Sequence, residues 1–156
     1  MADGASGAVY YVGGLGTPVG VGGFEGVQVF GSGFEMTVGL GLGMAAAAAE
    51  PKLKADTLQW AAMPRLRFGV DQDRAFTIGA GISGGGYGSS PDCNLITALA
   101  CDYPIRYVIW ANVEIGREAW SPGGFAFRYF AGFGHGFASG DSFNIPYFGV
   151  GFGYHF

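Results

Sequence analysis

The chain ends in Ile145-Pro146-Tyr147-Phe148-Gly149-Val150-Gly151-Phe152-Gly153-Tyr154-His155-Phe156, a stretch that alternates between large apolar residues and glycine or polar ones. Successive side chains of a β-strand point to opposite sides, so a period of two places the residues of each kind on one face. One face therefore carries Phe148, Val150, Phe152, Tyr154 and Phe156, and the other is largely glycine. This stretch predicts a strand with one large apolar face and one nearly bare face.

Five upstream segments repeat this alternation, at residues 34–44, 57–70, 76–83, 105–115 and 125–137. Two glycine-rich segments, 7–15 and 21–30, bring the number of expected strands to about eight, but their faces cannot be assigned from so many glycines. Pro64 stands within one of the alternating segments. Because proline lacks the N–H that a sheet ladder needs, we expect a bulge or a local break at that position.

The composition favours a membrane protein built from strands. Of the 156 residues, 13% are charged and 16% are aromatic, whereas soluble domains average roughly 25% charged residues. A membrane-spanning helix needs about 18 or more apolar residues in a row, and no stretch of this chain supplies them. Lipid requires an apolar outer face rich in aromatics, opposite a face of glycine and a few charges. In hydrocarbon every backbone group must be paired within the protein, so the strands must close into a barrel. We therefore predict an all-β, transmembrane, antiparallel up-and-down β-barrel that forms a single domain over residues 1–156.

The connections are expected to differ at the two ends of the barrel. Residues 30–33, 71–74 and 118–124 look like tight turns, whereas 45–56, 87–103 and 138–144 look like longer loops. Short periplasmic turns and longer surface loops are typical of outer-membrane barrels, so we expect both termini on the periplasmic side. Residues 1–5 lack the basic and apolar regions of a signal peptide. For an exported protein we therefore expect that the signal was removed.

The last eight residues resemble the C-terminal assembly signal of bacterial outer-membrane barrels. Gly151, Tyr154 and the terminal Phe156 occupy its glycine and aromatic positions, whereas Gly149 stands where that pattern has a polar residue. Together with the alternating strands, this ending makes the chain similar to the small eight-stranded barrels of the OmpA, OmpX and OmpW type. The resemblance implies a Gram-negative outer-membrane location, insertion by the barrel assembly machinery, and contact with outer-membrane lipid and lipopolysaccharide. It implies no single activity, because a fold does not fix a function.

Charged residues of the expected strands share the inward face. They are Glu35, Arg65, Arg67, Arg106, Glu114 and Arg128. They can form a salt-bridged plug, because eight strands leave an interior just wide enough for side chains, or they can line a small pore. Glu35 and Glu114, with Glu25 as a possible third carboxylate, face four inward arginines. Eleven further inward positions are glycine (39, 41, 43, 79, 81, 132, 134, 136, 149, 151 and 153). We therefore expect polar cavities without a large, stable conductance.

His135, Ser139 and Asp141 are the strongest candidates for catalysis. A histidine, a hydroxyl and a carboxylate near one strand end resemble the sites of small lipid A deacylase barrels, in which the histidine and serine lie two residues apart; here that position is Phe137. A lipid-modifying hydrolase is thus the alternative to a non-enzymatic structural or surface role. The arrangement also suits a histidine at the membrane interface.

Other partners and cofactors follow from charge and cysteine content. The net charge is −4 and the eight Lys and Arg residues are scattered, so no nucleic-acid surface is expected. Cys93 and Cys101, an even number in an exported protein, predict a disulfide. Two cysteines without a nearby histidine do not form a metal site. We expect a monomer without a cofactor.

Overall fold

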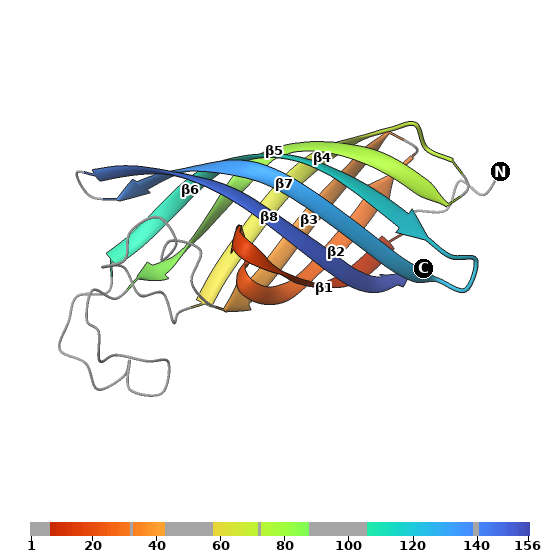
Figure 1. The fold of residues 1–156 in the computed structure, drawn as a ribbon, viewed down its shortest axis with the longest axis horizontal. Coiled ribbons are helices and arrows are strands. Elements are labelled where there is room, and N and C mark those ends of the chain that lie inside the picture. The colour runs from red at the N-terminus through yellow and green to blue at the C-terminus, as the bar shows by residue number, and fades with distance from the viewer. Residues whose placement is uncertain (1–6, 32, 43–57, 72, 88–105, 139–140) are drawn as a thin grey trace.

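The computed structural model describes residues 7–31, 33–42, 58–71, 73–87, 106–138 and 141–156, of which residues 87, 106, 138, 141 and 143 are described by their backbone alone. Eight strands make up this part of the chain: β1 (Gly7–Thr17), β2 (Gly20–Phe30), β3 (Phe34–Leu42), β4 (Leu58–Phe68), β5 (Arg74–Tyr87), β6 (Arg106–Trp120), β7 (Phe125–Ala138) and β8 (Asp141–His155). Each strand pairs antiparallel with its sequence neighbours, and β8 pairs with β1 to close the barrel (Figure 1). The predicted all-β, up-and-down barrel of eight strands is confirmed.

The barrel has two distinct ends. The turn end carries the connections from β2 to β3, from β4 to β5 and from β6 to β7. The opposite end, where β3 stops at Leu42 and β4 starts at Leu58, is called the loop end (Figure 1). At the turn end Gly7 and Phe156 exchange two backbone hydrogen bonds of 2.8 Å, so the chain closes the sheet with its last residue. Within the described ranges no helix is long and apolar enough to cross a membrane.

The prediction of a longer loop at 138–144 is wrong. β7 runs to Ala138 and β8 starts at Asp141, with Phe137 opposite Ser142 and His135 opposite Asn144. The polar residues Asp141, Ser142 and Asn144 suggested a loop. A strand can carry polar side chains at its end, because its backbone still forms hydrogen bonds to the neighbouring strand there.

Large apolar side chains cover the outside of the barrel. Phe24 of β2 and Phe148 and Tyr154 of β8 are each about 60% exposed, and every described strand contributes such residues. The faces of the first two strands, which could not be assigned from the sequence, are now defined. Tyr10 of β1 and Glu25 of β2 are buried in the interior, as are the residues two positions further along each strand.

Pro64 breaks the pairing of β4 with β5 without a bulge. Ala62 lies opposite Ile82 and Arg65 opposite Gly79, so the register is the same on both sides of the gap. On the other side, Pro64 keeps its place opposite Met36 in the ladder with β3. The expected local break is confirmed and the bulge is absent, because Pro64 faces outward and only its missing N–H disturbs the sheet.

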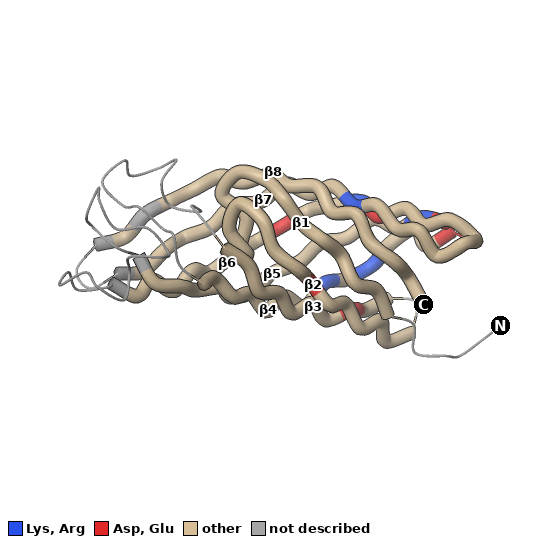
Figure 2. Tube along the Cα trace, turned by 90° about the horizontal axis from the view of Figure 1, so that it is seen from below, with Lys and Arg blue, Asp and Glu red and all other residues tan. Residues whose placement is uncertain are grey.

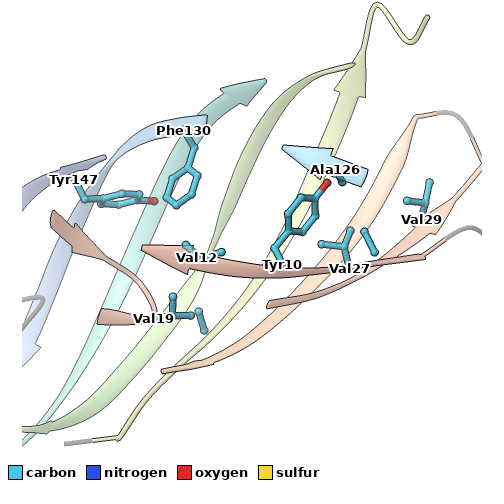
Figure 3. Packing of buried hydrophobic residues seen from close by; sticks show 10 residues of the cluster. Tyr10, Val12, Val19, Val27, Val29, Ala126, Phe130 and Tyr147 are labelled. Carbon is cyan, nitrogen blue, oxygen red and sulfur yellow. The ribbon is translucent and has the colours of Figure 1, made fainter. Parts of the chain in front are cut away.

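An apolar cluster occupies much of the interior beside β1 and β2. It contains Tyr10, Val12, Val19, Val27, Val29, Phe130 and Tyr147, together with small alanines (Figure 3). The ring centroids of Phe130 and Tyr147 lie 6.3 Å apart in an edge-to-face arrangement. The interior is therefore not uniformly polar, and its polar residues gather beside this cluster.

Candidate functional site

Seven buried charged side chains form a band across the interior that we call the charged layer. It consists of Glu25, Glu35, Arg65, Arg67, Glu114, Glu118 and Arg128, each at most 7% exposed. Figure 2 shows the described charges between the middle of the barrel and the turn end. Five strands, from β2 to β4 and then β6 and β7, supply these side chains, because each strand places every second residue inside.

Arg128 makes the two shortest ion pairs of the layer. Its Nη1 lies 2.5 Å from Glu25 Oε2, and its Nη2 lies 2.8 Å from Glu114 Oε1. Its guanidinium carbon also lies 4.6 Å from the centre of the Phe130 ring and 5.7 Å from that of Tyr10. Arg128 therefore connects β7 to a non-neighbouring strand and packs its charge against the apolar cluster.

Arg65 makes a second junction beside the first. Its Nε lies 3.0 Å from Glu114 Oε1, its Nη2 lies 3.7 Å from Glu25 Oε2, and its Nη1 lies 3.6 Å from Glu35 Oε1. Nη1 also donates a hydrogen bond to the hydroxyl of Thr37. Glu25 and Glu114 are thus shared between two arginines, which is how buried charges become tolerable in a protein interior.

Arg67 and Glu118 form the part of the layer nearest the turn end. Arg67 Nε lies 3.5 Å from Glu35 Oε2, and its guanidinium carbon lies 5.1 Å from the centre of the Trp120 ring. Trp120 is stacked on His155, with 5.4 Å between the ring centroids and 10° between the planes. Glu118 is buried, and its Oε1 has no hydrogen-bond partner within the described residues.

The expected excess of arginine is wrong for the described residues. Four carboxylates, Glu25, Glu35, Glu114 and Glu118, face three arginines inside the barrel. Sequence reasoning left Glu25 unassigned and missed Glu118, although the parity of Asn112 and Glu114 on the same strand extends to Glu118. The side chain of Arg106 lies outside the described residues. The expectation of a hydrated interior therefore gains no support from unpaired arginines.

Four of the inward glycines leave no empty space, because large side chains from elsewhere in the barrel fill it. A Cβ on Gly151 would lie 2.9 Å from Arg128 Cγ, and one on Gly79 would lie 2.7 Å from Arg65 Cγ. A Cβ on Gly136 would lie 2.6 Å from the Trp110 ring, and Gly132 lies under the ring of Tyr147. The glycine positions thus contradict the reasoning that glycine leaves the interior hydrated.

His135, the histidine of the alternative hydrolase site, has a polar neighbour on the adjacent strand. It lies on the outer face of β7, where its Nδ1 is 2.6 Å from Asn144 Oδ1 on β8. A nucleophilic hydrolase requires the histidine beside the hydroxyl that it activates. Ser139 lies outside the described residues, as does the side chain of Asp141. Asn144 was missed because it becomes a neighbour only through the pairing of β7 with β8.

The C-terminal residues lie where β8 closes the barrel. Tyr154 and Phe156 are on the outer face at 58% and 70% exposure, and Gly151 faces the interior beside Arg128. Cys93 and Cys101 lie outside the described residues. No group of three or more metal-ligating side chains occurs among the residues that the structure describes. In chemical terms, the charged layer pairs opposite charges across the interior of the barrel.

Comparisons with protein-family models, with curated proteins and with solved structures found no match for this chain. The fold and the charged layer therefore stand on the geometry of this chain alone.

Proposed function

We propose that the protein is an integral outer-membrane β-barrel of the small OmpA, OmpX and OmpW type, with a structural or surface-interaction role rather than an enzymatic one. The observation that carries this proposal is the inverted distribution of residues. Phe and Leu side chains are about half exposed over the whole outer face, whereas Arg65, Arg128 and Glu35 are almost completely buried. Soluble monomers rarely expose continuous apolar patches larger than a few hundred Å².

Strand length agrees with a membrane span. The shortest strand, β3, has 9 residues, and β6 and β8 have 15 each. A tilted strand crosses the hydrocarbon core with about 9 to 11 residues. The turn end, which carries Gly7 and Phe156, then faces the periplasm, and the loop end faces outward toward lipopolysaccharide.

The charged layer gives this barrel a closed interior rather than a pore. Buried arginines and carboxylates that share partners across several strands hold the strands together and obstruct the axis. A barrel of eight strands has only enough width for side chains. The protein would then act through its outer surface and its loop end, with no solute passing through it.

The requirement for lipid tests this proposal. Urea-unfolded protein is diluted into vesicles of outer-membrane phospholipid and, in parallel, into lipid-free buffer. We expect β-structure and protease resistance only with vesicles, because the apolar outer face needs hydrocarbon around it. A folded, monodisperse protein in lipid-free buffer would contradict the proposal.

The same vesicles test the alternative of a lipid-modifying enzyme. Lipopolysaccharide and phospholipid are added, and released acyl chains are measured for the wild type and for His135→Ala. We expect no release above background from either protein. Acyl release that disappears in the His135→Ala variant would establish the hydrolase instead.

A further inference from the structure

The hairpin between β1 and β2 leaves the wall of the barrel. Gly13 lies opposite Gly22 and Thr17 opposite Gly20, so the register shifts within this hairpin. The pairing of β1 with β8 ends at Leu15, and the pairing of β2 with β3 ends at Gly22. Residues 17–20, which we call the tip, thus lie beyond the ladders of both neighbouring strands.

Two glycines, one just before the tip and one at its last residue, allow the chain to turn inward. Gly16 has a φ of 70° and Gly20 a φ of 88°, which glycine adopts far more readily than other residues. Thr17 and Val19 are completely buried. The hydroxyl of Thr17 donates a hydrogen bond to the carbonyl of Gly20, so the tip satisfies polar groups within itself. Val19 joins Val12, Phe130 and Tyr147 in the apolar cluster (Figure 3).

The wall around the tip lacks side chains where the tip needs room. A Cβ on Gly39 of β3 would lie 2.5 Å from Val19 Cγ1, and a Cβ on Gly149 of β8 would lie 2.9 Å from Thr17 Cγ2. The same Cβ on Gly39 would lie 3.0 Å from Glu25 Cγ. The tip therefore lies directly against the charged layer, in a recess formed by glycines.

On its other side, the tip faces polar side chains across very little space. A cavity of about 10 Å³ is bordered by Thr17 and Pro18 of the tip and by Gln59, Ser83 and Asn112 of the wall. Asn112 donates a hydrogen bond of 2.9 Å to the hydroxyl of Ser83. A cavity of this size holds about one water molecule. This cavity is too small to hold a hydrated ion.

We propose that the tip is an internal plug that closes the barrel in series with the charged layer. The proposal rests on the membrane-spanning barrel proposed above. It extends that proposal because it assigns the closure of the barrel interior to two separate structures, the tip and the charged layer. An ion moving from the loop end to the turn end meets the tip first and the charged layer next. Either barrier alone stops it, so only the loss of both opens a conducting path.

The position of the tip is tested by a disulfide, in a background with Cys93→Ser and Cys101→Ser. Val19→Cys with Gly39→Cys places two Cβ atoms within about 4 Å of each other, inside the range of a disulfide. We expect this pair to crosslink on oxidation of the folded protein in vesicles. The control pair, Val21→Cys with Gly39→Cys, should stay reduced, because Val21 points outward. If the first pair stays reduced in folded protein, the tip is not inside and the proposal is wrong.

Single-channel recording tests the two barriers. One variant replaces residues 14–21 with Asn-Gly, a two-residue turn that directly joins Gly13 and Gly22. A milder variant, Thr17→Gly with Val19→Gly, removes the side chains of the tip and keeps the backbone. A third, Glu25→Ser with Arg128→Ser, opens the charged layer while leaving Arg65 paired with Glu114 and Glu35. Val21→Ala is the control on the exposed face of the same hairpin.

We expect the wild type and each of these variants to be silent, and the third variant combined with either tip variant to conduct. Conductance from the charged-layer variant alone, equal to that of the combination, would mean that the tip blocks nothing. A silent combination in protein that has folded would also overturn the proposal, as would full conductance from a tip variant alone. Failure of the wild type to enter vesicles at all would instead contradict the proposed function, which keeps the two failures distinct.

Discussion

Arg128 connects two carboxylates from separate strands, Glu25 and Glu114, in a part of the barrel that water does not reach. Arg128→Ala leaves both carboxylates short of a partner in a buried site. Breaking a buried pair in this way costs about 3 to 5 kcal/mol. We expect the free energy of unfolding in vesicles, measured by urea titration, to fall by that amount.

Arg74 supplies the matched control for Arg128. It pairs with Asp71 at 3.2 Å, but its side chain is 53% exposed at the turn end. Exposed ion pairs contribute about 0 to 1 kcal/mol. Arg74→Ala should therefore change the free energy of unfolding very little. Equal losses of unfolding free energy from Arg74→Ala and Arg128→Ala would show that the buried ion pairs stabilise the fold no more than an exposed pair does.

Gly136 tests whether the inward glycines are needed for packing. An added Cβ would lie 2.6 to 2.8 Å from three atoms of the rigid Trp110 ring. Overpacking of this kind costs about 1 to 3 kcal/mol. Gly136→Ala should lower the free energy of unfolding by that amount. Gly13→Ala, whose Cβ meets its nearest atom at 3.5 Å, should cause no loss. Equal stability of the two variants would mean that the packing around Gly136 does not require a glycine there.

Phe156, the residue after β8, extends the pairing with β1 through its backbone, while its ring is 70% exposed. Phe156→Ala keeps both hydrogen bonds to Gly7 and removes only the ring. If the ring is read during assembly, the variant should give less folded protein in the membranes of living cells. Its stability once folded should stay close to that of the wild type.

Phe148→Ala is the control for Phe156→Ala, because Phe148 is exposed on the same face of β8 but is not part of the assembly signal. The yield in cells, measured by the amount of folded protein in the membrane fraction, should stay high for this variant. An unchanged yield from Phe156→Ala would count against the resemblance of the C-terminal residues to an assembly signal.

The segment between β5 and β6 contains Cys93 and Cys101, for which the sequence predicts a disulfide. Closing a loop of this size restricts the unfolded chain and stabilises the fold by up to about 3 kcal/mol. Denatured, unreduced protein from an exported preparation should not react with a thiol reagent. Labelling of two cysteines per chain would remove this bridge.

The strands differed in how much the sequence could tell about them. Strands β3 to β8 alternate between large apolar and small or polar residues, and this contrast correctly predicted their faces. In β1 and β2 both faces carry glycine and apolar residues, since Tyr10, Val12 and Val27 pack inside. No contrast marks the interior there, so Glu25 remained unassigned.

At the scale of the whole molecule, period-two alternation was enough to predict a closed barrel of eight strands. It was not enough to predict how the interior is filled. The contact between Gly151 and Arg128, and the inward turn of residues 17–20, depend on the register between strands and on side chains reaching across the barrel. A pattern read along one strand carries no information about either.

The central claim, that hydrocarbon surrounds the outer face, is tested most directly by a charge placed on that face. Val113 lies in the middle of β6 and is 56% exposed, whereas Leu58, 59% exposed, is the first residue of β4 at the loop end. An arginine on the lipid face costs about 2 to 4 kcal/mol at the bilayer midplane and about 0 to 1 near the interface. The free energy of unfolding from vesicles should therefore fall by the larger amount for Val113→Arg and by the smaller for Leu58→Arg. If Val113→Arg is as stable as the wild type, the outer face is in water and the account is wrong.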